Sequence, residues 1–318
     1  MRPKLKGYDH GNFLFSRANK GKNKTNMSEY IGSFLHVCIS WPRLYLAFID
    51  YQKAFDTIWR AELWRKLIKE GVGGKFLNII KDMYAKSKSC VFVNGQKSDY
   101  FSSQAGVRQG EILSPLLFAF YINDLEEYLK SKKISSLDSL KIISGDSQTL
   151  CSSDLDLYLD LLTLYYADDT IILSETSSGL QAALNELFNY CNESKLTVNE
   201  DKTKIMCITQ KENRDLKFHY NGKELEIVEE FTYLGVKFTN KGISKEAVLA
   251  RIIPSQKSMF ATLSNCKASN IPIDLVLELF DKIVMPCMLY GGEVFGFKNI
   301  AVLERIQLKY AKYALIKP

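Results

Sequence analysis

Residues 161–173 have the sequence LLTLYYADDTIIL. Two apolar runs, Leu161–Tyr166 and Thr170–Leu173, are separated only by an alanine and the acidic pair Asp168-Asp169. This spacing predicts two strands joined by a tight hairpin turn. Two adjacent carboxylates beside apolar strands repel each other and lose hydration unless a cation compensates them. Taken alone, such a pair is more typical of a solvated surface turn than of a metal site.

A third aspartate follows another apolar strand candidate, since Leu44–Ile49 ends on Asp50. If this strand lies beside the hairpin, Asp50, Asp168 and Asp169 meet at one edge of a sheet. Carboxylate oxygens are preferred ligands of magnesium, which is usually held by one or two carboxylates together with substrate phosphates. Two such ions could activate a hydroxyl group and stabilise a leaving pyrophosphate, as in-line phosphoryl transfer requires.

The rest of the chain predicts an alternation of strands and helices, which is typical of an α+β fold. We treat residues 131–160 as a surface insertion. The first expected elements are a helix from about Arg60, with Leu63, Leu67 and Ile68 on one face and Gly71 as its cap, and a hairpin over Cys90–Phe101 that turns at Asn94-Gly95. A helix capped by Ser114 follows, with Pro115 at its first position and Leu117, Phe118, Tyr121, Ile122 and Leu125 at helical spacing. The remaining expected elements are a helix over Gly179–Lys195, a strand over Ile205–Thr209, a hairpin at Asn221-Gly222, a strand over Phe231–Phe238, and helices around 245–265, 273–285 and 299–315.

The composition is that of a globular chain. With 318 residues, 46% of them hydrophobic, it can bury a core in one large domain or in two to three smaller ones. No apolar stretch reaches the roughly 20 residues that cross a bilayer, and the first residues lack the apolar run of a secretory signal. We therefore expect no membrane partner and an intracellular location, nuclear or cytoplasmic. The 7 cysteines form no C-x-x-C pair, so we expect reduced thiols rather than disulfides or a zinc site.

Charge is distributed unevenly along the chain. The net charge is +6 over residues 1–49, −5 over residues 50–239 and +5 over residues 240–318. An acidic centre between basic ends suits an enzyme that gathers cations at its centre and holds a phosphate backbone at its periphery. Imbalances of this size also arise by chance.

Four ordered segments carry a family resemblance: AFIDYQKAFD at 47–56, QAGVRQGEILSPLLF at 104–118, YADD at 166–169 and LTVNEDKTK at 196–204. Together they resemble the motifs of reverse transcriptases, most closely those of non-LTR (LINE-type) retrotransposons. FTYLG at 231–235 looks like the primer grip of that family, a hairpin whose backbone positions the primer terminus. LYGGEVF at 289–295 is similar to a helix junction in its thumb, with Phe295 in place of the usual tryptophan.

The resemblance implies a right-hand polymerase fold with a ferredoxin-like palm, an antiparallel sheet, partial fingers and a helical thumb. Residues 1–49 would form a partial, basic fingers segment. Residues 50–239 would form the palm, with inserted fingers elements at about 60–105. Residues 240–318 would form the thumb-like region. Family members normally carry longer fingers before the first motif, so we expect a fragment of a longer polyprotein or a degraded copy.

Roles for single residues follow from the same resemblance. Phe55 could equally be an ordinary core aromatic, and Lys202 a solvated surface lysine. The implied assignments are Asp50, Asp168, Asp169 and the Tyr51 carbonyl as metal ligands; Phe55 as the steric gate against ribonucleotides; Arg108, Gln109 and Gly110 as nucleotide-binding residues; Lys202 as the acid that protonates pyrophosphate; and Tyr233, Leu234 and Gly235 as the primer grip.

The implied activity is RNA-directed DNA polymerisation with two Mg²⁺ ions, for which Mn²⁺ could substitute. The expected partners are dNTPs, an RNA template and a DNA primer. A catalytically silent, nucleic-acid-binding remnant of such an enzyme is the alternative. A metal-dependent nuclease fits less well, because it explains neither Gln109-Gly110 nor the primer-grip resemblance.

Overall fold

The computed structural model describes residues 43–134, 163–166, 168–209, 216–241, 245–290 and 300–315. The chain divides into two compact units: the first consists mainly of Arg43–Cys207 and Lys211–Val228, and the second mainly of Glu229–Pro318. Three expectations lie outside the described residues: the basic segment up to residue 42, most of the 131–160 insertion, and the thumb motif beyond residue 290.

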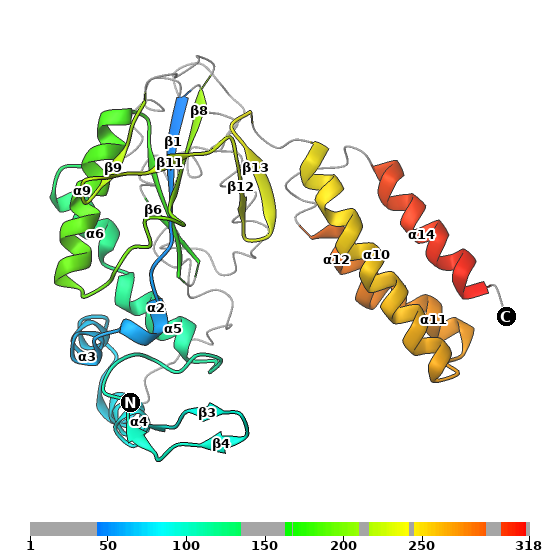
Figure 1. Ribbon diagram of the computed structural model, residues 1–318, viewed down its shortest axis with the longest axis horizontal. Coiled ribbons are helices and arrows are strands. Elements are labelled where there is room, and N and C mark those ends of the chain that lie inside the picture. Colours follow the sequence, from blue (N-terminus) through cyan, green and yellow to red (C-terminus); the bar gives the residue numbers. More distant parts are fainter. Residues whose placement is uncertain are drawn as a thin grey trace, which may run out of the picture. The chain divides into compact units, whose positions relative to one another are not determined.

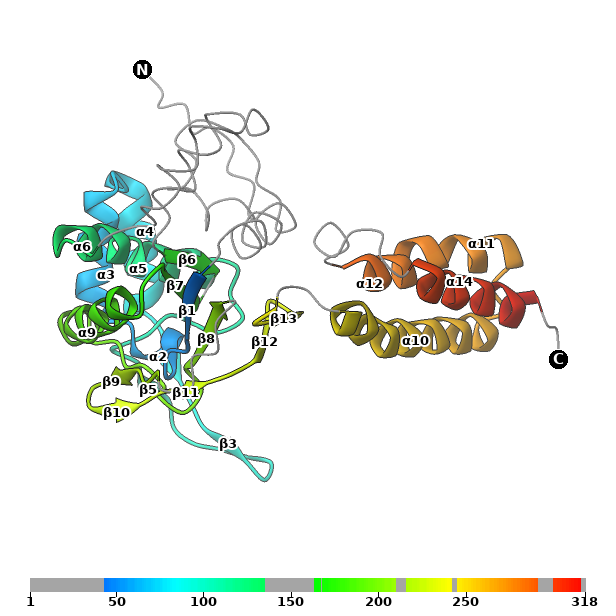
Figure 2. The same cartoon turned by 90° about the horizontal axis from the view of Figure 1, so that it is seen from above.

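A five-stranded sheet forms the centre of the first unit, in the order β11-β8-β1-β7-β6. Strand β1 is its middle strand (Figure 1) and is antiparallel to β7, which in turn pairs with β6 as a hairpin (Figure 2). The expected neighbourhood of the Asp50 strand and the Asp168 hairpin is confirmed. The bounds are β1 Arg43–Ile49, β6 Thr163–Tyr166, β7 Asp169–Ser174, β8 Lys204–Thr209 and β11 Glu226–Ile227.

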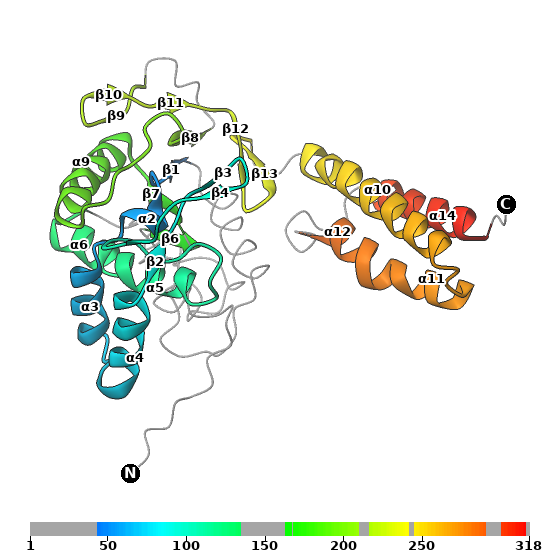
Figure 3. The ribbon, with the colours of Figure 1, turned by 60° about the horizontal axis from the view of Figure 1, so that its bottom comes forward.

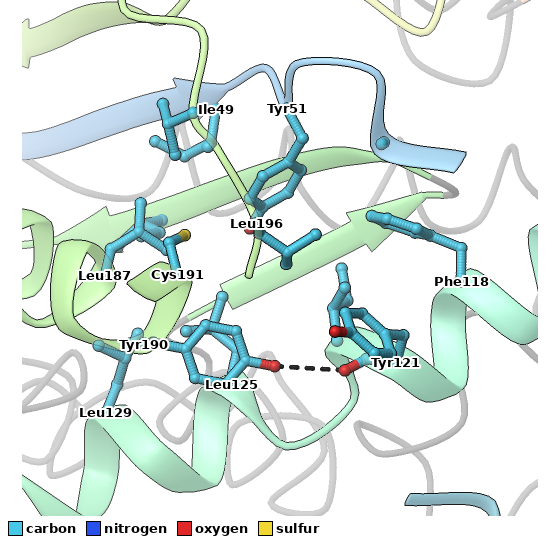
Figure 4. Close-up of a cluster of buried hydrophobic side chains, with 14 of the residues drawn as sticks. Ile49, Tyr51, Phe118, Tyr121, Leu125, Leu129, Leu187, Tyr190, Cys191 and Leu196 are labelled. Carbon is cyan, nitrogen blue, oxygen red and sulfur yellow. Dashed lines mark hydrogen bonds between the residues drawn. The ribbon is translucent and has the colours of Figure 1, made fainter. Parts of the chain in front are cut away.

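Strand β1 is buried on both faces. All six residues from Leu44 to Ile49 are at most 4% exposed, as expected of a strand in the middle of a covered sheet. Alternate residues of β1 join the main hydrophobic core, and Figure 4 shows Ile49 above Leu187 and Tyr190 of helix α9 (Ser177–Glu193).

Helices cover one face of this sheet (Figure 2). Helix α5 buries Leu117, Phe118, Tyr121 and Ile122, as its spacing predicts. The chain leaves α5 at Ile122, and Leu125 begins a new helix, α6, instead of extending the first. The bounds are α5 Ser114–Ile122, α6 Leu125–Ser131 and α9 Ser177–Glu193.

Three helices and two short strand pairs lie between β1 and α5 in the sequence. The hairpin β3–β4 turns at Asn94-Gly95 as expected and extends away from α4 (Figure 1). On α3, Leu63 and Leu67 are buried as expected, but Ile68 is 56% exposed and Lys66 is buried instead. The bounds are α2 Ala54–Thr57, α3 Arg60–Lys69, α4 Gly74–Ala85, β2 Lys88–Ser89, β3 Phe92–Val93, β4 Gln96–Lys97 and β5 Phe101–Ser102. A further hairpin, β9 His219–Tyr220 with β10 Lys223–Glu224, turns at Asn221-Gly222 as expected.

The second unit consists of a hairpin followed by packed helices (Figure 3). The expectation of one strand over Phe231–Phe238 is wrong, because Leu234 and Gly235 both have positive φ and turn the chain back. The helix expected over 273–285 continues to Leu289 through a π-helical turn. The bounds are β12 Glu230–Tyr233, β13 Val236–Thr239, α10 Lys245–Ala268, α11 Ile273–Leu279, η2 Phe280–Val284, α12 Met285–Leu289 and α14 Ile300–Leu315.

Across the described part of the chain, none of the helices combines the length and the apolar character needed to span a membrane.

Candidate active site

Asp50 is held at the end of β1 by its own backbone. Its N–H donates to Oγ1 of Thr203 at 3.2 Å, and its carbonyl accepts from the N–H of Asn199 at 2.7 Å. Thr203 is fully buried, so this anchor is shielded from water. The segment that contains Lys202 is thereby fixed beside the first predicted metal ligand.

The acidic pair lies beside the same strand end. Ile49 of β1 pairs with Thr170 of β7, so the antiparallel register places Asp50 next to Asp169. Although Asp169 keeps an exposed surface, the pKa of its carboxyl is raised to about 6, first because neighbouring atoms displace water and then because Asp168 and Asp50 repel its charge. The three aspartates therefore interact electrostatically.

This donor set suits a divalent cation. Carboxylate oxygens are the ligands that magnesium prefers, and a cation would relieve the repulsion that raises the pKa of Asp169. Among the described residues, however, no three acidic, histidine or cysteine side chains lie close enough to form a ready-made metal site.

A pocket of about 640 Å³ opens at this point of the first unit. It brings together three of the predicted metal ligands, the predicted steric gate and the Gln109-Gly110 step. The lining residues are Asp50, Tyr51, Lys53, Ala54, Phe55, Gln109, Gly110, Glu111, Ile112, Ser114, Pro115, Asp168 and Lys202. Asp169 and Arg108 are not among them.

Phe55 reaches the pocket from the short helix α2. Its ring is half-buried and packs on Phe118 of α5, with ring centroids 5.4 Å apart. Lys53, which precedes α2 and lines the pocket, has a left-handed backbone with φ 47°. Sequence reasoning gave Lys53 no role. Its position between Asp50 and Phe55 in the first motif could have indicated that Lys53 lies at the same site.

The loop that carries Gln109 is docked on the segment that carries Phe55. The N–H of Val107 donates to the Phe55 carbonyl at 2.7 Å, and that of Gly106 donates to Ile58 at 2.9 Å. The Arg60 guanidinium donates to three carbonyls of this loop, including Gly106 at 2.8 Å. Arg60 was not singled out from the sequence, because only the folded loop brings these carbonyls together.

The guanidinium of Arg108 already has partners within the protein. It pairs with Glu111 at 2.6 Å and donates to the Ser87 hydroxyl at 3.3 Å, so it does not face the pocket as a phosphate ligand would. Ser114 was expected to cap helix α5. Instead it is the first helical residue, and its hydroxyl donates to the Arg108 carbonyl at 2.5 Å. The capping prediction is wrong because the helix begins one residue earlier than a serine cap requires.

Lys202 extends from the turn after Asn199. Its Nζ lies 4.0 Å from Oδ2 of Asp50, and 70% of its side chain is exposed. The ammonium group is therefore close to the aspartates but free to move toward a bound ligand.

The predicted primer grip lies in the second unit. Tyr233 is buried, and the turn of Leu234 and Gly235 has φ of 47° and 73°. The Tyr290 hydroxyl donates to the Leu234 carbonyl at 2.7 Å, and the Arg251 guanidinium lies 5.1 Å from the centre of the Tyr290 ring. The turn is thus tied to the helices of its own unit.

The family model for "Reverse transcriptase (RNA-dependent DNA polymerase)" matches residues 19–238. The chain belongs to the reverse transcriptase family. The match spans all four motifs and the predicted primer grip, and it agrees with the α+β, right-hand polymerase fold expected from the sequence. Reverse transcriptases generally use divalent metal ions and bind a nucleic-acid template and primer.

Curated relatives of this reverse transcriptase chain come from mobile elements. The RNA-directed DNA polymerase from mobile element jockey of Drosophila melanogaster is 23% identical over 84% of the chain and 27% of the relative. The Pol polyprotein of the type-2 retrotransposable element R2DM, also from Drosophila melanogaster, is 26% identical over 62% of the chain and 18% of the relative. The chain spans about a quarter or less of the length of these relatives.

Among solved structures, apo telomerase from Candida tropicalis is similar with a TM-score of 0.46 and 15% identity, covering 93% of this chain and 52% of that chain.

Proposed function

We propose that this chain carries the polymerase centre of an RNA-directed DNA polymerase of a non-LTR retrotransposon, which joins dNTPs to a primer 3′ hydroxyl. The observation that carries the proposal is the single pocket that combines Asp50 and Asp168 with Phe55, Gln109 and Lys202. Carboxylates can hold metal ions and an ammonium group can pair with a phosphate, while an aromatic ring and an amide can contact the rest of a nucleotide.

Asp50, Asp168 and Asp169, with the Tyr51 carbonyl, would hold two Mg²⁺ ions, or Mn²⁺ in their place. Bound there, the ions would activate the primer hydroxyl and neutralise the charge of the leaving pyrophosphate. The chain's own part is to hold these oxygens at the end of a buried strand, where both the N–H and the carbonyl of Asp50 are hydrogen-bonded.

The remaining residues would bind and orient the nucleotide. The Phe55 ring, supported by Phe118, would leave no room for a 2′ hydroxyl. Gln109 and Gly110 would contact the nucleotide, and Arg108 would support their loop or reach a phosphate. Lys202, close to Asp50 and largely exposed, would donate a proton to the departing pyrophosphate.

The second unit would hold the primer. Tyr233, Leu234 and Gly235 form a tight turn whose backbone would contact the primer terminus, and the following helices would form a thumb. The RNA template and DNA primer would be bound through shape and backbone contacts, with the basic residues after position 240 as phosphate partners.

Primer extension on an RNA template in Mg²⁺ tests the proposal. The Asp168→Ala variant should lose at least about 10²-fold in rate, because a group that stabilises transition-state charge is removed. Asp82→Ala is the matched control, since Asp82 is an exposed aspartate on α4 outside the pocket lining. Equal extension by wild type and Asp168→Ala would refute the aspartate assignment. No extension by either, with template binding retained, would favour the silent remnant.

A further inference from the structure

Asp56 has been assigned no role, although it lies next to two residues that line the pocket, Phe55 and Gln109. It follows Phe55 on α2, and its Oδ1 and Oδ2 accept hydrogen bonds from Nε2 of Gln109 at 3.3 and 3.2 Å. Gln109 lines the pocket, whereas Asp56 does not. A carboxylate from the first motif thus holds an amide from the second, 53 residues further along the chain.

The backbone keeps these two side chains in reach of each other. Val107 donates to the Phe55 carbonyl, and Gly106 has φ +77°. A Cβ atom at Gly106 would lie 2.6 Å from the Asp56 carbonyl oxygen, so only glycine allows this close approach. The contact between Asp56 and Gln109 therefore rests on a docked pair of segments rather than on two freely moving side chains.

The chemistry of the two groups allows one orientation. An ionised carboxylate can only accept hydrogen bonds, while a glutamine amide has an NH₂ donor and a carbonyl acceptor. Facing Asp56, the amide must present its nitrogen. Its carbonyl oxygen has no bonded donor among the described residues, and it remains an acceptor for a group that enters the pocket.

We propose that Asp56 is a positioning residue that fixes the Gln109 amide in this orientation, so that the Gln109 carbonyl accepts a hydrogen bond from a donor group of the incoming nucleotide. The inference rests on the proposed polymerase function. Asp56 itself touches no reacting atom and acts through Gln109.

A double-mutant cycle tests this dependence. Asp56→Ala should raise the KM for dNTP about fivefold to tenfold and leave kcat within about twofold, since one positioning hydrogen bond is lost. Asp56→Asn should fall between wild type and Asp56→Ala, because a carboxamide can accept this bond but no longer forces its direction. In a Gln109→Ala background, Asp56→Ala should have little further effect. Asp82→Ala should match wild type. An unchanged KM in Asp56→Ala, or effects that multiply in the double variant, would overturn the proposal.

A second measurement needs no turnover and separates this inference from the proposed function. The side-chain amide NMR signals of Gln109, assigned by their loss in Gln109→Ala, should shift in Asp56→Ala and stay in place in Asp82→Ala. If wild type extends no primer yet this shift is seen, the polymerase proposal fails while the positioning contact stands. If the Gln109 signals are the same in wild type and Asp56→Ala, the inference is refuted whatever the activity.

Discussion

Gly106 has no room for a side chain. Its φ of +77° disfavours any residue with a Cβ, and a Cβ would meet backbone atoms of Asp56 and Phe55. Gly110, in the same loop, has φ +85°, but a Cβ added there would meet nothing within 4 Å. An alanine at either position would have a strained backbone, but only an alanine at position 106 would also clash with neighbouring atoms.

Gly106→Ala should lower the free energy of unfolding by about 2–4 kcal/mol, the sum of left-handed strain and a backbone clash. Gly110→Ala should lower it by only about 1–2 kcal/mol, the strain alone. Urea denaturation followed by circular dichroism measures both. Equal losses for the two variants would mean that the loop is not docked as described.

Asp169 gives stability a pH dependence with a definite sign. Its pKa is raised from 3.8 to about 6 in the folded chain, so between these values the folded state binds more protons than the unfolded state. The contribution of this group to stability is then highest at low pH and falls as pH rises through this window.

In EDTA, the difference in urea midpoint between Asp169→Asn and wild type should grow in favour of the variant from about pH 4 to pH 6–7. Saturating Mg²⁺ should oppose this trend, because a bound cation compensates the carboxylate charge. A difference that does not change with pH would show that neither burial nor the neighbouring aspartates raise the pKa of Asp169 in the folded chain.

At the scale of elements, a buried lysine joins the helices of the first unit. Nζ of Lys66 on α3 donates to the Tyr121 carbonyl at 2.6 Å and to Asp124 at 2.7 Å, and it lies 3.1 Å from the Tyr190 hydroxyl of α9. Burial lowers the pKa of Lys66, and Asp124 counteracts this effect. Figure 4 shows the hydrogen bond that the Tyr190 hydroxyl donates to the backbone carbonyl of Tyr121.

Asp124→Ala should cost about 3 kcal/mol of unfolding free energy, because it leaves the buried ammonium group without its counter-ion. Adding Lys66→Met should recover part of that loss, since the uncompensated charge is gone. Lys69→Ala, which removes an exposed pair with Glu127, should cost less than about 1 kcal/mol. Chemical denaturation decides the order, and similar losses for Asp124→Ala and Lys69→Ala would contradict it.

Elements with one clear periodicity were predictable, and others were not. Strand β1 and the acidic hairpin follow from continuous apolar runs. Helix α4 was not anticipated, because apolar residues lie on both its buried and its exposed faces, such as Ile80 and Ile79. The spacing of apolar residues did not indicate the turn at Leu234, because leucine rarely adopts positive φ. Only the resemblance to a primer grip implied a hairpin there.

For the whole molecule, sequence motifs located the pocket but not the contacts that organise it. The order of Asp50, Gln109, Asp168 and Lys202 along the chain indicated one shared site, because their residue types serve one chemistry. The bond of Asp56 to Gln109 and the anchor of Thr203 on Asp50 link residues 53 and 153 positions apart. No local pattern encodes such pairs, so they appear only once the sheet is assembled.

The middle position of β1 limits how this gene can change. Side chains alternate between the two faces of a strand, so one residue inserted or deleted between Arg43 and Ile49 would turn Asp50 to the opposite face of the sheet. Exchange of one apolar residue for another leaves that alternation intact. Related chains should therefore differ in the apolar residues of this segment while keeping its length, and a one-residue insertion or deletion there should separate Asp50 from Asp168 and Asp169.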